Sequence, residues 1–144
     1  MTFNPKEVKT LAEGIELIKR VQSDLGLSQD VIFTSIDVAR AGGHSDLQVT
    51  NIPSGFSKTM LPFFTDGAAT FYLSSGAPGS VVPRHSHEEG AGVRFIVSGS
   101  IRYGDQILRE GDWMLMPAGA EYEFTVGQTG VTMIYCYRCT CIQR

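Results

Sequence analysis

The chain has 144 residues, of which 42% are hydrophobic and 19% are charged, and its formal net charge is −3. A chain of this length fits one domain with a single core. The mildly acidic balance and the lack of a basic run argue against a nucleic-acid partner. No stretch approaches 18 uninterrupted apolar residues, and the first residues lack an apolar signal segment, so we expect no membrane partner.

Residues 1–27 are expected to form a helix that packs on the outside of the domain. Asn4 is a suitable N-cap, and Pro5 fits the first helical position. Gly26 is placed to end the helix. Between them, apolar residues recur with the helical period at Val8, Leu11, Ile15, Ile18, Val21 and Leu25.

Residues 28–144 are expected to form one all-β domain. Runs of β-branched and aromatic residues, such as "ATFYLSS" and "VTMIYCYRC", alternate with glycine, proline and polar turns. Closely spaced runs of this kind predict an antiparallel sandwich or barrel. The run "VIFTSIDV" at residues 31–38 fits either a strand or a short helix.

The sharpest local signal is His85-Ser86-His87. On a strand, alternate side chains point to the same face, so both imidazoles can converge on one metal ion. Two histidines alone also fit paired polar residues on a strand, so the surrounding sequence has to decide.

The surroundings resemble the cupin superfamily. The first cupin motif is matched at residues 79–99 by Gly79, His85, His87 and Gly99, and the second at residues 111–126 by Gly111, Pro117 and Gly119. The resemblance is to small single-domain bacterial cupins of the RmlC-like type. It implies a double-stranded β-helix, or jelly-roll barrel, with the N-terminal helix outside it, and a homodimer.

This chain departs from the cupin pattern at the usual metal ligands. Gly92 stands where the motif has a glutamate, Tyr122 replaces the third histidine, and Val126 occupies the asparagine position. Catalytic metal sites normally use three protein ligands. Glu89, which shares strand parity with both histidines, is therefore a predicted third ligand, and Glu88 is the alternative.

If a metal is bound, the resemblance implies one divalent ion of iron, manganese, nickel or zinc. His44, the third histidine of the chain, lies in a loop-like segment and could fold over the mouth of the barrel.

A metal-free site is the other interpretation. If Gly92 faces the cavity, Arg94 faces it too by alternation, and its guanidinium suits a carboxylate, phosphate or enolate oxygen. His85 or His87 then acts as general acid or base, with Tyr122 as a proton donor. The structural alternatives are an outward Arg94 paired with Glu88 or Glu110, and a Tyr122 that only fills the core.

Two further groups of residues are noted. An apolar pocket could be lined by Met60, Phe63, Phe64, Phe71, Tyr72, Met114, Met116 and Phe124, although plain core is the commoner role. Cys136, Cys139 and Cys141 lack a fourth zinc ligand and are odd in number, so a disulfide framework is not expected and a reducing, cytoplasmic setting is.

These patterns predict an enzyme that acts on a small oxygenated metabolite in the barrel pocket. With a metal it would be a dioxygenase or lyase, and without one a dehydratase or isomerase. The alternative is a non-catalytic cupin that binds or senses a small ligand and has lost its metal site. Fold alone does not choose between these activities.

Overall fold

The computed structural model describes residues 2–65 and 68–138. It begins with helices α1 (Leu11–Leu25) and α2 (Ser35–Arg40) and the 3₁₀ turn η1 (Ser45–Leu47). Seven strands follow: β1 (Phe56–Phe64), β2 (Thr70–Gly76), β3 (Val81–His85), β4 (Gly92–Tyr103), β5 (Gln106–Arg109), β6 (Trp113–Met116) and β7 (Tyr122–Tyr137). The all-β class with an N-terminal helix is confirmed.

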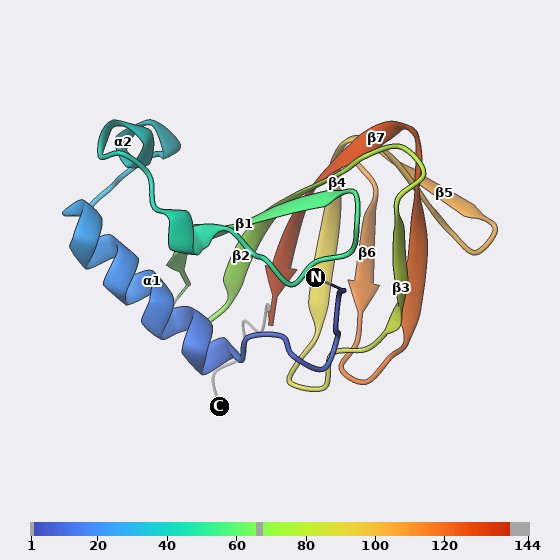
Figure 1. Ribbon diagram of the computed structural model, residues 1–144, viewed down its shortest axis with the longest axis horizontal. Coiled ribbons are helices and arrows are strands. Elements are labelled where there is room, and N and C mark those ends of the chain that lie inside the picture. Colours follow the sequence, from blue (N-terminus) through green and yellow to red (C-terminus); the bar gives the residue numbers. More distant parts are fainter. Residues whose placement is uncertain (1, 66–67, 139–144) are drawn as a thin grey trace.

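The strands form one antiparallel sheet that curls into a barrel (Figure 1). Its order is β1-β2-β7-β4-β5, with β3 paired to β7 and β6 paired to β4. The 16-residue strand β7 pairs with β2 through its C-terminal half, with β3 through its N-terminal half and with β4 through parts of both. The predicted jelly-roll barrel is therefore confirmed, with β7 as the strand that joins its parts.

Gly99, the last glycine of the first motif, is required by the backbone. Its φ of 76° lies in the left-handed region, and a Cβ there would meet the backbone carbonyl of Gly130. Only glycine allows β4 to bulge at this point and still pair with β7.

Helix α1 begins later than the sequence prediction. Its N-cap is Thr10, whose hydroxyl accepts from the backbone N–H of Glu13 while the Glu13 carboxylate accepts from the N–H of Thr10. This capping box outcompetes the expected start at Asn4 because it satisfies two helix-end donors at once. Asn4 instead hydrogen-bonds Asn51, which holds the N-terminal segment against the barrel. The helix ends at Gly26, as predicted.

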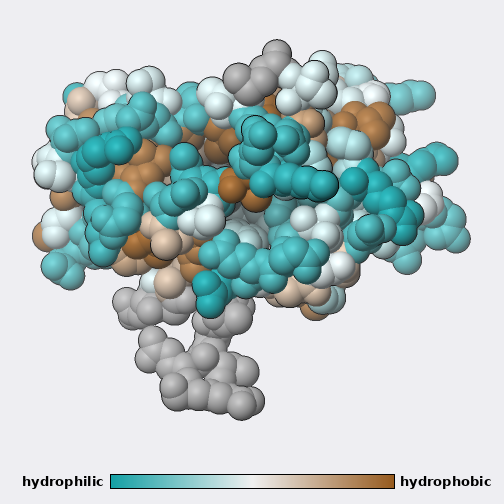
Figure 2. Space-filling view, turned by 60° about the horizontal axis from the view of Figure 1, so that its bottom comes forward, coloured by the Kyte–Doolittle hydropathy of each residue, from teal (hydrophilic) through white to brown (hydrophobic). Residues whose placement is uncertain are grey.

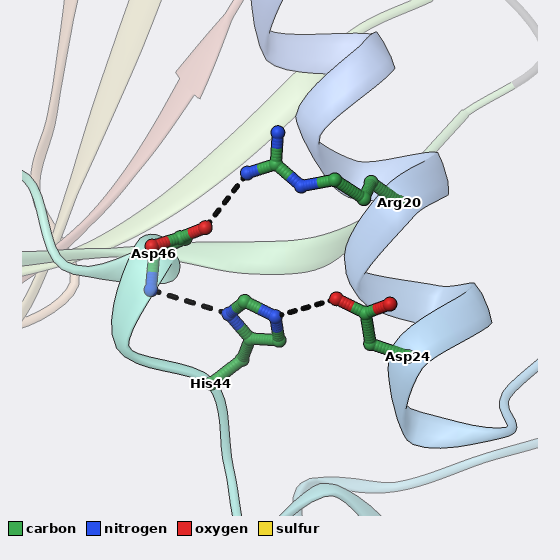
Figure 3. A network of polar contacts seen from close by, with 4 residues as sticks. All are labelled: Arg20, Asp24, His44 and Asp46. Carbon is green, nitrogen blue, oxygen red and sulfur yellow. Dashed lines mark hydrogen bonds and ion pairs between the residues drawn. The ribbon is translucent and has the colours of Figure 1, made fainter.

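Helix α1 packs against β1 at the side of the barrel (Figure 1). Its buried residues Leu17, Ile18 and Val21 form a cluster with Leu47 and Met60. A polar network next to this cluster ties α1 to η1 (Figure 3). Arg20 pairs with Asp46 at 2.7 Å, and His44 Nε2 lies 2.9 Å from an Asp24 oxygen.

The position of His44 corrects one expectation. Its Nδ1 accepts from the backbone N–H of Asp46, and its other ring nitrogen faces Asp24, so the imidazole is held on α1 rather than over the barrel mouth. Residues 31–38, for which the sequence allowed a strand or a short helix, form no strand, and α2 begins within them at Ser35.

An apolar surface lies on the outer face of β4 and β6. Phe95 pairs directly with Trp113, and both are exposed, as are Val97 and Leu115. The expected homodimer stays a prediction, and this face is the surface that we expect a second copy to cover.

Within the described residues no helix is long and apolar enough to cross a bilayer. Cys139 and Cys141 lie outside the described residues. Cys136 is buried on β7 and is disulfide-bonded, so the expectation of reduced cysteines is wrong for this residue.

Candidate functional site

A cavity of about 260 Å³ lies inside the barrel. Inward side chains of β1, β2, β4 and β7 form its walls, and parts of the N-terminal segment and of residues 46–53 close it on another side. Figure 2 turns the lower end of Figure 1 toward the reader and shows a mainly hydrophilic face that is hollowed near its centre. Of the four residues predicted to be catalytic, His85, His87 and Arg94 line this cavity, and Tyr122 contacts the last two of them.

His85 and His87 do come together. His85 is the last residue of β3, whereas His87 lies in the following loop, where its carbonyl accepts from the N–H of Gly119. Their ring centroids are 5.0 Å apart. Tyr122 is the direct cross-strand partner of His85, with ring centroids 4.6 Å apart. The first and second cupin motifs therefore meet at this point.

Tyr122 connects a cation to an imidazole. Its hydroxyl oxygen lies 3.2 Å from Arg94 Nη2 and 3.2 Å from His87 Nε2. Because a guanidinium can only donate, the phenol oxygen accepts from Arg94 and keeps its own hydrogen for His87. The tautomer that follows is assigned from this network, with His87 Nε2 as the acceptor. Tyr122 is thus more than core filling.

Arg94 points into the barrel, so the outward alternative with Glu88 or Glu110 is wrong. The residue is 6% exposed, and its guanidinium carbon lies 4.4 Å from the ring centroid of Tyr135 and 5.2 Å from that of Phe124. Its Nε has no hydrogen-bond partner. No carboxylate of the described residues lies within ion-pair distance of it.

A second cation, Lys58, was missed by the sequence analysis. Its ammonium nitrogen lies 4.5 Å from the ring centroid of Tyr72 and 4.9 Å from that of Tyr135. Lys58 shares strand parity with Met60, which was named as a pocket residue, and this parity was the available signal. Of the apolar residues named with Met60, Tyr72 and Phe124 also line the cavity, whereas Phe63, Phe64, Phe71, Met114 and Met116 do not.

Tyr135 fills the place that the family glutamate leaves. It is the cross-strand partner of Arg94, and a Cβ built on Gly92 would lie 2.6 Å from the Tyr135 hydroxyl oxygen. The Tyr135 phenol from β7 therefore occupies the space that a side chain at position 92 would need. The Tyr135 hydroxyl is buried without a partner. The sequence analysis did not single out Tyr135, because its contact depends on the register between β4 and β7.

Burial is the main reason that both histidines are neutral, and the two cations add to it. Burial, then His85, Lys58 and Arg94, lower the pKa of His87 to about 4. Burial is also the main cause that lowers the pKa of His85, and Arg94 and Lys58 add to it. His85 Nδ1 lies 2.7 Å from the Pro83 carbonyl, which can only accept, so Nδ1 carries the hydrogen. Both imidazoles are therefore neutral near pH 7.

The buried tyrosines are neutral as well. Burial raises the pKa of Tyr72 and of Tyr135, and burial together with Glu89 raises the pKa of Tyr137 to about 12. A neutral phenol can donate a hydrogen bond and brings no negative charge. The inner part of the cavity is thus positive, with neutral donors around it.

Glu89 does not join the histidines, which corrects its assignment as the third metal ligand. Its carboxylate accepts from the N–H of Leu11, at the start of α1, and from the Tyr137 hydroxyl at 3.2 Å. The parity argument failed because β3 ends at His85, four residues before Glu89. A carboxylate at a helix N-terminus is stabilised by the free N–H groups there.

Comparison of the sequence with family models identifies the family of this chain. The family described as the ChrR cupin-like domain matches residues 41–139. The chain belongs to this cupin family. A search of curated protein sequences finds no significant match.

Solved structures show the same fold at low sequence identity. KdgF from Halomonas sp. is 15% identical with a TM-score of 0.54, over 64% of this chain and 86% of that one. An RmlC-like cupin from Shewanella frigidimarina is 16% identical with a TM-score of 0.53, over 69% and 90%. The polyketide cyclase RemF from Streptomyces resistomycificus is 15% identical with a TM-score of 0.52, over 65% and 72%. At these sequence identities the similarity shows the fold alone, so the activity has to be inferred from the cavity residues.

The residues of this cavity do not fit a divalent metal ion, which cupin sites often hold. No three His, Cys, Asp or Glu side chains in the described part of the chain are grouped as metal ligands. His87 Nε2 is engaged by Tyr122, and the carboxylate of Glu89 is held elsewhere. Arg94 and Lys58 already oppose a proton on either imidazole, and the same positive charge opposes a dication.

The contact between Gly92 and Tyr135 gives a stability prediction. Gly92→Ala should lower the free energy of unfolding by about 1–3 kcal/mol, because its methyl group overlaps the Tyr135 ring. In a Tyr135→Leu background the same change should cost much less, because the shorter side chain leaves room. Urea unfolding of the four proteins measures both costs. Equal costs in the two backgrounds would show that Tyr135 does not occupy this place.

Proposed function

We propose that this cupin is an enzyme that binds a small organic anion in the barrel cavity and transfers a proton on it without a metal ion. One observation carries the proposal: the buried guanidinium of Arg94 has no carboxylate partner among the described residues and is linked through Tyr122 to His87. Dehydration or isomerisation is the reaction class that such a unit suits.

A buried charge without a counterion is costly, and a bound anion would remove that cost. Arg94 is stabilised in part by the faces of Tyr135, Phe124 and Tyr122. The Arg94 Nε–H has no hydrogen-bond acceptor among the described residues, so an oxygen atom of a ligand could accept from it. A planar guanidinium matches the two oxygens of a carboxylate or the oxygen of an enolate.

The rest of the wall suits the body of a small metabolite. Met60, Val82, Phe124 and Met133 supply apolar surface, and the cavity volume of about 260 Å³ equals roughly nine water molecules of liquid, which suits a small metabolite. Neutral phenols are available for hydroxyl or carbonyl oxygens of the ligand. This combination explains why the proposed substrate is both anionic and oxygenated.

His87 is the proposed base. It is neutral at pH 7, and its Nε2 is the acceptor in the bond with Tyr122. A pKa of about 4 makes a weak base. An anion bound at Arg94 would raise this pKa, because it offsets the positive charge that now lowers it. The transfer passes through Tyr122: the phenol gives its hydrogen to His87 Nε2 and takes the proton of the ligand in its place, and the reverse steps return a proton to the ligand.

Lactate is a suitable probe of the anion site because it is a small hydroxy acid, and lactamide is its uncharged counterpart. We expect lactate to bind and Arg94→Met to weaken it by about 10- to 100-fold, which is the typical worth of a charge-assisted hydrogen bond. Isothermal titration calorimetry measures both ligands against the wild type and the variant.

Arg84→Met is the matched control, because Arg84 is exposed and paired with Glu121 on the outer side of β3. It should bind lactate as the wild type does. If lactamide binds as tightly as lactate, or Arg94→Met binds lactate unchanged, the anion site is refuted.

The proton-transfer step has its own test. Methyl hydrogens of pyruvate should exchange with D₂O faster in the presence of the protein, and His87→Gln should reduce this acceleration by about 100-fold or more. Proton NMR follows the exchange. Glutamine keeps a hydrogen-bonding group toward Tyr122 but cannot take up the proton, so unchanged exchange in the variant would remove His87 from the reaction.

A further inference from the structure

We propose that Lys58 is a nucleophile that forms an imine with a carbonyl group of the bound anion. The substrates are then small carboxylates that also carry an aldehyde or ketone. This inference rests on the proposed anion site, since Arg94 holds the carboxylate while Lys58 meets the carbonyl carbon. It adds a covalent step that proton transfer by His87 alone does not include.

The placement of Lys58 supports this role. It sits within β1, between Phe56 and Met60 on the cavity side of the strand, and its amine lies over the rings of Tyr72 and Tyr135. Among the described residues no carboxylate lies within 4.0 Å of its nitrogen. Lys19, by contrast, is exposed on α1 and lies 3.5 Å from Glu16.

The charges around Lys58 favour the free amine. Burial and then Arg94 lower its pKa to about 7, so about half of the side chains are unprotonated at neutral pH. The unprotonated amine is the form that attacks a carbonyl. The other ionisable groups that line this cavity are Glu7, Lys9, Asp46, Tyr72, His85, His87, Tyr135 and Tyr137, and the two carboxylates among them belong to the N-terminal segment and η1.

The reaction balances without an oxidant or a reductant. The Lys58 nitrogen forms a bond to the carbonyl carbon, and the carbonyl π electrons move to oxygen, which takes up a proton. The nitrogen loses a proton, the hydroxyl leaves as water after a second protonation, and a C=N bond forms. Tyr135 is a neutral donor beside Lys58 whose hydroxyl has no other partner, so it can supply the first proton.

Pyruvate with sodium cyanoborohydride tests this chemistry, because the hydride reduces an imine to a stable secondary amine. At pH 7 we expect the adduct at Lys58, formed about 10-fold or more faster than at Lys6 or Lys19, since an ordinary lysine is almost fully protonated there. Intact mass and peptide mapping locate the adduct. Lactate, which has no carbonyl, should give none.

Two variants and a pH series complete the test. Lys58→Arg keeps the cation and should give no fast adduct, and Lys58→Met checks that the fold survives without the charge. Adduct formation at Lys58 should reach half of its maximum near pH 7, whereas Lys19 should react only at much higher pH.

The outcomes separate this inference from the proposed function. A fast adduct at Lys58 together with lactate binding supports the imine at the anion site. A fast adduct without lactate binding overturns the placement of the carboxylate on Arg94. Lactate binding without preferred labelling of Lys58 overturns the imine and leaves the anion site standing. Neither lactate binding nor preferred labelling overturns both.

Discussion

The buried guanidinium of Arg94 is the interaction on which the rest of the site depends. It lies against the rings of Tyr135 and Phe124 and donates to Tyr122, yet no described carboxylate balances its charge. Burial is the main cause that lowers the pKa of Lys58, His85 and His87, and Arg94 adds to it in each case. Burial and Arg94 together thus leave neutral imidazoles and a partly unprotonated amine beside a guanidinium that has no carboxylate partner among the described residues.

The same residue explains how a cupin cavity can serve a different chemistry. Gly92 and Tyr122 stand where the superfamily motif has two metal ligands, and Tyr135 occupies the space beside Gly92. The phenols in these places bring no carboxylate, and each hydroxyl can donate a hydrogen bond. A cavity that could attract a cation through carboxylate and imidazole groups therefore offers positive charge and donors, which suits an anion.

Local patterns predicted the fold and half of the site. The two motifs identified the barrel, and the parity of Gly92 and Arg94 on one strand correctly turned Arg94 inward. Tyr135 and Lys58 were missed because their contacts depend on the register of β7 with β4 and of β1 with β2, which one strand does not reveal. Glu89 was misplaced because parity holds only within a strand, and β3 ends at His85. The helix start was misplaced because Thr10 and Glu13 form a better cap than Asn4.

The most direct test of the central claim is a crystal structure of the protein grown with both lactate and zinc. The account predicts that the lactate carboxylate lies within hydrogen-bond distance of the Arg94 guanidinium and that no zinc ion bridges His85 and His87. A zinc ion coordinated by both histidines, with Arg94 turned away from the cavity, would contradict it.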